Sequence, residues 1–125
     1  MKEFFVKSFR DLEVFKKSYK ISLEIHKVTL GFPQIEQRSL ADQLRRCSKS
    51  ICANIAEGFG KQKYSSAEYR RFLSMAVGSC NEMCVWLQYC IDLGYISPDQ
   101  FEDWSSAYEV VARMIVNLIK SWQGK

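Results

Sequence analysis

Apolar and polar positions alternate along this chain with the period of an α-helix, in four successive segments. The first segment, over about residues 11–30, repeats apolar side chains every three or four positions, as at Val14, Ile21 and Ile25. Charged side chains fill its opposite face. The run Gly31-Phe32-Pro33 ends this helix, because proline disfavours helical geometry in the residue before it.

Two further helices are expected over about residues 38–57 and 65–93. Leu44, Ile51 and Asn54 lie on one seam of the second helix, and Gly58 and Gly60 are expected to end it. The third helix carries apolar residues at heptad spacing and has Gly94 as its C-terminal stop. Both helices are therefore amphipathic and face a shared core.

The fourth helix is expected over about residues 98–122. Ser97-Pro98-Asp99-Gln100 has the N-cap serine, first-turn proline and early acid that are typical of a helix start. Four long helices with short connections pack most simply as an antiparallel up-and-down four-helix bundle, so the fold class is all-α. At 125 residues, the chain fits one domain, 1–125.

The stretch from Ser50 to Ala56 carries no formal charge, although the helix before it has a basic face. A surface helix normally keeps a polar stripe, so this stretch is expected to be buried on most sides. We expect Ala53 and Ala56 to be shielded from water, and Asn54 to need a hydrogen-bond partner. One chain supplies too little cover for this apolar surface, which favours self-association.

Composition excludes several classes of protein. The chain has no apolar run of the roughly 18 residues that a membrane span needs, and its first residues are too charged for a signal peptide. We expect a cytoplasmic protein. The five cysteines lie within helical patterns, which favours buried thiols over disulfides. With His26 as the only histidine and no Cys-x-x-Cys pair, no metal site is expected.

Seven basic residues form two clusters that could contact nucleic acid. They are Arg45, Arg46 and Lys49 on the second helix, and Lys61, Lys63, Arg70 and Arg71 around the start of the third. The alternative for either cluster alone is a solvated charged face. Stacking aromatics are scarce nearby, so contact with backbone phosphates is the expected mode, in keeping with a net charge of +4.

Three polar or small residues near the end of the second helix form a structural motif. Asn54 is expected to fix helix register through a buried hydrogen bond, and Glu57 either to pair with Lys61 or to hydrogen-bond neighbouring backbone groups. Gly58 is expected to stop the helix. His26 lies on a seam that faces the core, where a structural role is expected.

The chain resembles the four-helix bundle protein family, also called 23S rRNA-intervening sequence proteins, over almost its whole length. The elements that carry the resemblance are residues 9–14, 32–36, 43–46, 50–58, 71–79 and 93–96. The resemblance implies an antiparallel bundle that assembles as a homo-oligomer, a pentamer in relatives, with no established enzymatic activity. The accessory protein of diversity-generating retroelements is also similar, and it engages nucleic acid and a reverse transcriptase.

No motif for catalysis is found. The chain lacks a phosphate-cradling glycine loop, a two-histidine metal motif and a paired Glu-x-x-His arrangement, so we expect no catalytic residue, cofactor or small-molecule substrate. The leading hypothesis is a non-enzymatic homo-oligomer that binds RNA or DNA through phosphates, without a membrane partner. The alternative is a protein-interaction scaffold or accessory subunit that makes no direct contact with nucleic acid.

Overall fold

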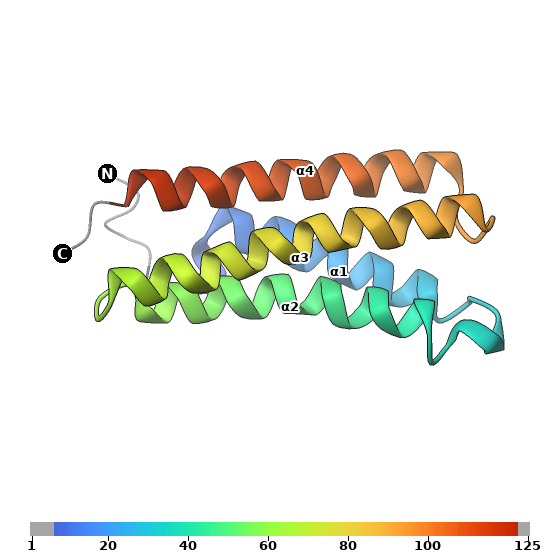
Figure 1. Cartoon of the computed structure of the whole chain (residues 1–125), viewed down its shortest axis with the longest axis horizontal. Helices are drawn as coiled ribbons and strands as arrows, with labels where there is room; N and C mark the ends of the chain where they lie inside the picture. The colour runs from blue at the N-terminus through green and yellow to red at the C-terminus, as the bar shows by residue number, and fades with distance from the viewer. Residues whose placement is uncertain (1–6, 123–125) are drawn as a thin grey trace.

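The computed structural model describes residues 7–122, and within them four helices form an up-and-down bundle (Figure 1). The helices are α1 (Glu13–Thr29), α2 (Leu40–Lys61), α3 (Ser66–Asp92) and α4 (Pro98–Ser121). Short 3-10 turns, η2 (Phe9–Asp11) and η3 (Gln34–Glu36), precede α1 and α2. Helices that follow one another in sequence pack side by side, so the predicted all-α fold is confirmed.

Several helix ends have the capping residues that the sequence predicts. Ser97 and Gln100 form a capping box at the start of α4, with each side chain accepting a hydrogen bond from the other residue's backbone N–H, at 3.1 and 2.9 Å. Ser65 accepts from the Glu68 backbone N–H at 3.1 Å and starts α3. Gly94 has a φ of 78° and ends α3, as the sequence predicts.

The expected stop at Gly58 is wrong. Helix α2 passes through Gly58 and Gly60 and ends at Lys61. A Cβ atom built at Gly58 would lie 3.3 Å from Leu73 Cδ2 and 3.3 Å from the Tyr69 carbonyl oxygen. Gly58 is therefore buried where α2 and α3 approach closely, and its missing side chain serves helix packing.

The core lies between the four helices and consists mainly of aliphatic side chains. Among the side chains with no exposed surface are Ile25, Leu44, Ile51, Ile55, Met83, Leu87, Tyr108, Val111 and Ile115. Helix α1 is the shortest of the four and packs more extensively on α2 than on α4. No helix of the described chain is both long and apolar enough to cross a membrane.

The uncharged stretch of α2 is not buried on most sides. Ile51, Cys52 and Ile55 face the core, but Ala53 is exposed and Ala56 is half-buried in the single chain. The prediction that water is excluded from both alanines is therefore wrong. The solvent side of this stretch carries small uncharged residues in place of large apolar ones, so it supplies no surplus apolar surface for self-association.

Candidate nucleic-acid interface

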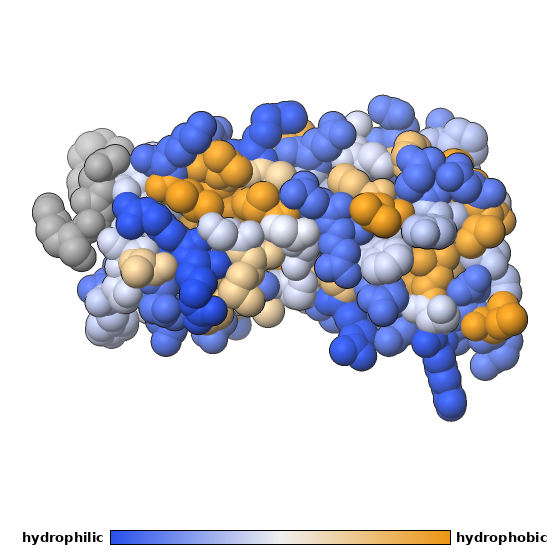
Figure 2. All heavy atoms as spheres, viewed as in Figure 1, coloured by the Kyte–Doolittle hydropathy of each residue, from blue (hydrophilic) through white to orange (hydrophobic). Residues whose placement is uncertain are grey.

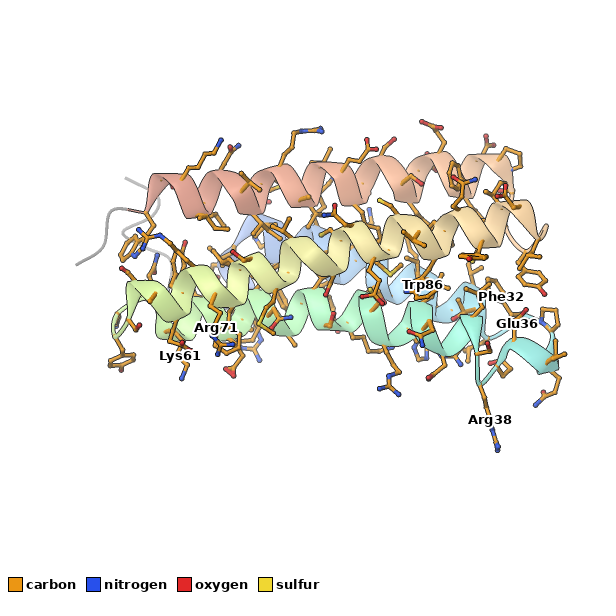
Figure 3. All side chains as sticks on the ribbon, in the orientation of Figure 1. Phe32, Glu36, Arg38, Lys61, Arg71 and Trp86 are labelled. Atoms are coloured by element: carbon orange, nitrogen blue, oxygen red, sulfur yellow. The ribbon has the colours of Figure 1, made fainter. Side chains whose placement is uncertain are left out.

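The seven predicted cations fall into two groups that a single chain keeps apart. Arg45, Arg46 and Lys49 lie midway along α2, whereas the other four surround the turn from α2 to α3. From Arg45 to Lys61 the helix rises about 24 Å at 1.5 Å per residue. Figure 3 places Lys61 and Arg71 together at the end of the bundle that holds this turn.

Arg45 is engaged in holding the connection between α1 and α2. One guanidinium N–H group donates to Thr29 Oγ1 at 3.1 Å, and the Nη2 atom donates to the Gln37 carbonyl and side-chain oxygens at 3.1 and 3.2 Å. The Gln37 amide in turn donates to the Thr29 and Phe32 carbonyls at 2.9 and 3.0 Å. This half-buried arginine is thus a structural clamp, and its donors are largely used.

Arg46 and Lys49 are exposed beside this clamp. Arg46 faces Asp42 at 3.6 Å with 78% of its side chain exposed, so that ion pair leaves it accessible. Lys49 Nζ lies 2.9 Å from His26 Nδ1. The pKa of Lys49 is lowered, mainly by its partial burial and next by the nearby charge of Arg45. The pKa of His26 is also lowered, mainly by the charge of Lys49.

His26 was expected to face the core, but it is half-buried and lies beside Lys49 at the α1–α2 surface. The two residues are 23 positions apart, so only the packing of α1 on α2 brings them together. The helical period of α1 places His26 at the edge of its apolar face and gives no indication of this neighbour.

The end of α2 and the turn that follows it carry exposed cations. Lys61 and Lys63 are exposed, and neither forms an ion pair within 4.0 Å among the residues that the structure describes. Arg71 is held by a two-point contact with Glu68, at 2.9 and 3.1 Å, which lowers the pKa of that carboxyl group. Arg70 donates from Nη2 to the Trp122 carbonyl at 3.2 Å.

An open cavity of about 700 Å³ lies beside these lysines. The lining residues are Lys7, Leu12, Ile55, Phe59, Gly60, Gln62, Lys63, Tyr64, Tyr69, Leu73, Leu118 and Trp122. None of these lining residues is acidic. We call Lys7, Lys61, Lys63, Arg70 and Arg71, which lie around the cavity and the turn, the cationic end. Sequence reasoning missed Lys7 and Trp122 because their proximity to the turn depends on the fold.

Two further cationic regions lie outside the predicted set. Lys16, Lys17 and Lys20 of α1 line a shallow groove of about 430 Å³ with Glu13 of α1 and with Val110 and Met114 of α4, and Lys16 forms an ion pair with Glu13 at 3.4 Å. Arg38 extends away from the opposite end of the bundle, as Figure 3 shows. The sequence indicates only an ordinary charged helix face at these positions, because the groove forms only when α1 packs against α4.

The interactions predicted for the polar residues of the α2 motif are not formed among the described residues of the single chain. Asn54 is half-buried, and its side chain forms no hydrogen bond with any residue from 7 to 122. Glu57 is exposed and makes no ion pair with Lys61 within that range. The register role of Asn54 and the Glu57–Lys61 pair are therefore not seen in the single chain.

All five cysteines are free thiols, and all but the half-buried Cys84 are buried, as expected for packing residues. Burial raises the pKa of Cys47, Cys80 and Cys90 to about 12, so these thiols are unreactive at neutral pH. No group of three or more metal-ligating side chains is placed to hold an ion in the described part of the chain.

The comparisons with known proteins agree with this architecture. The family model described as 23S rRNA-intervening sequence protein matches residues 10–117. A crystal structure of a protein with unknown function from the S23 ribosomal protein family of Bacteroides thetaiotaomicron has a TM-score of 0.74 and 27% sequence identity. That match covers 86% of this chain and 96% of the other. A comparison with curated proteins finds no match. The chain therefore belongs to the 23S rRNA-intervening sequence protein family.

Proposed function

We propose that this protein is a non-enzymatic nucleic-acid-binding protein that contacts RNA or DNA phosphates through its cationic end. The observation that carries the proposal is the exposure of Lys61 and Lys63 without an ion-pair partner within the described range. A lysine that is free of internal partners can neutralise a phosphate without first losing a contact. Arg46, nearer the start of α2, adds a further accessible positive charge.

The expected contact is with the sugar-phosphate backbone. Lysine is a point charge that suits phosphate oxygens, and such contacts carry no sequence information. Arg70 and Arg71 already form hydrogen bonds with Trp122 and Glu68, so they contribute to binding mainly through the long-range electrostatic attraction of their positive charges. We therefore expect binding to be general and to depend on the two lysines more than on the arginines.

The test removes two charges from the cationic end and compares the result with two charges removed elsewhere. Lys61→Ala with Lys63→Ala should weaken binding of a short RNA or DNA about tenfold at low salt. Lys27→Ala with Arg38→Ala is the matched control, because both residues are exposed and lie away from this end: Lys27 is in the last turn of α1, and Arg38 is at the opposite end of the bundle in Figure 3. Fluorescence anisotropy gives both affinities; equal losses in the two double variants would contradict the proposed site.

Self-association is a separate part of the proposal. Three large apolar residues on one face of α3, Met75, Val85 and Tyr89, and the C-cap residue Leu93 after it are exposed, at 45, 52, 54 and 53%. Figure 2 shows apolar side chains gathered along the α3–α4 side, interrupted by hydrophilic ones. Such surfaces favour an interface, and a ring, a pentamer in the family resemblance, would repeat the cationic end and raise its avidity.

Light scattering tests the self-association. A homo-oligomer at micromolar concentration is expected, and Val85→Glu with Tyr89→Glu should reduce the mass toward that of one chain because buried charge opposes association. A clean monomer of the unmodified protein would contradict this part.

The same α3 face also supports a second candidate function, a scaffold or accessory subunit whose partner is another polypeptide. That function predicts an interaction that depends on Val85 and Tyr89 and is only weakly sensitive to salt. A phosphate-driven interaction has the opposite behaviour, so the salt dependence separates the two functions.

A further inference from the structure

We propose that the cavity at the cationic end accepts an unpaired nucleobase, while Lys7 and Lys63 hold the phosphates on either side of it. This inference rests on the proposed function and narrows its ligand to single-stranded or unpaired nucleotides. The supporting observations are the shape of this end of the bundle, the aromatic side chains around the cavity and the sign of its charge.

The cavity exists because α1 begins short of this end of the bundle. Helix α2 continues to Lys61 and α4 to Ser121, while α1 begins at Glu13, and Figure 1 shows α1 starting inward of its neighbours. Leu118, which a longer α1 would cover, therefore lines an open space of about 700 Å³ together with the buried Ile55. Pockets for small ligands commonly measure about 300–1,000 Å³, so a nucleotide fits.

The aromatic side chains suit a planar ligand. Tyr64 lines the cavity and is 83% exposed, so its ring is free to stack. The Tyr69 and Trp122 rings lie 5.5 Å apart on another part of the lining. Aromatic stacking accepts any base, because every base has a π-face.

The polar groups are also consistent with a base. Trp122 Nε1 is buried and has no hydrogen-bond partner among residues 7–122. A small rotation of this ring toward an acceptor in the cavity would cost no existing hydrogen bond, and every base carries acceptors on its edge. The Arg70 contact to the Trp122 carbonyl holds the backbone of this residue against α3.

Charge complementarity distinguishes a nucleotide from a neutral aromatic ligand. Lys7 and Lys63 line the cavity, and no acidic side chain is among the lining residues of the described chain. A base in the cavity would place its own phosphates near these two lysines. A paired base would first have to lose its stacking and pairing in the duplex, so the cavity should favour unpaired segments.

The test uses the full-length protein and three oligonucleotides with equal numbers of phosphates, each made as RNA and as DNA. The first is a single strand, the second carries abasic sites in place of its central bases, and the third is a hairpin duplex whose loop is a non-nucleotide linker, so that it has no unpaired base. At one salt concentration, anisotropy should show the intact single strand binding about five- to thirtyfold more tightly than the abasic strand. The hairpin should bind like the abasic strand.

Two variants locate the effect. Tyr64→Ala should remove most of the preference for the intact strand and leave hairpin binding within twofold, since Tyr64 is exposed and its loss does not disturb the core. Ile35→Ala is the control, an apolar side chain that is 82% exposed in η3, at the other end of the bundle (Figure 1). Quenching of tryptophan fluorescence by the single strand should be lost in Trp122→Phe, with folding checked by circular dichroism.

Equal affinity for intact, abasic and hairpin ligands would overturn the base-binding cavity while leaving phosphate contact intact. The cavity assignment is also overturned if Tyr64→Ala and Ile35→Ala behave alike. Absence of binding to all three ligands at low salt would overturn the proposed function together with this inference.

Discussion

Replacing Arg45 by alanine should destabilise the fold and leave nucleic-acid binding nearly unchanged. The guanidinium group donates three hydrogen bonds, at 3.1, 3.1 and 3.2 Å, to Thr29 and Gln37 in the α1–α2 connection. At about 1 kcal/mol net for each, their loss costs about 3 kcal/mol. Relief of the repulsion with Lys49 offsets part of this, so we expect a net loss of about 2 kcal/mol.

For a chain of this length, 2 kcal/mol corresponds to a fall in Tm of about 8 °C. Thermal and urea unfolding followed by circular dichroism measure this change. Arg46→Ala is the matched control because its 3.6 Å surface ion pair with Asp42 is worth less than about 1 kcal/mol. Unchanged stability in Arg45→Ala together with a marked loss of nucleic-acid binding would refute the structural role and restore Arg45 as a phosphate contact.

Three further outcomes follow from the packing and the charges. Gly58→Ala should lose about 1 kcal/mol of stability in urea unfolding because its Cβ would press on Leu73, while Gly60→Ala, with open space around it, should be neutral or slightly stabilising. Tyr108→Phe should not lower Tm, because the fully buried hydroxyl has no hydrogen-bond partner within residues 7–122. The lowered pKa of His26 means that the unfolded chain binds its proton more readily, so Tm should fall as pH drops from 7 to 5, and His26→Gln should flatten that dependence.

The elements of the fold were predictable wherever the signal is local. Ser97 with Gln100, and Gly94 after α3, act within a few residues of themselves, so their cap geometry follows from sequence. The helix stop predicted at Gly58 is wrong because a glycine can either end a helix or let a neighbouring helix approach closely. The neighbour that decides this, Leu73, is on the next helix. Ala53 was misread because lack of charge was equated with burial.

The candidate site was only partly predictable. Exposure of Lys61 and Lys63 follows from their position in a polar turn. The internal use of Arg45 could not be foreseen, because Thr29 and Gln37 reach it only after α1 folds back on α2. The cavity was equally hidden, since it depends on where α1 begins relative to the ends of α2 and α4.

The slope of log Kobs against log salt concentration for one oligonucleotide tests the assignment of the cationic end to phosphate binding. The unmodified protein should lose affinity steeply between 50 and 200 mM salt, and Lys61→Ala with Lys63→Ala should make the slope shallower by about 1.4–1.8, or about 0.7–0.9 for each lost phosphate contact. Identical slopes for the two proteins, or affinity that does not change with salt, would contradict it.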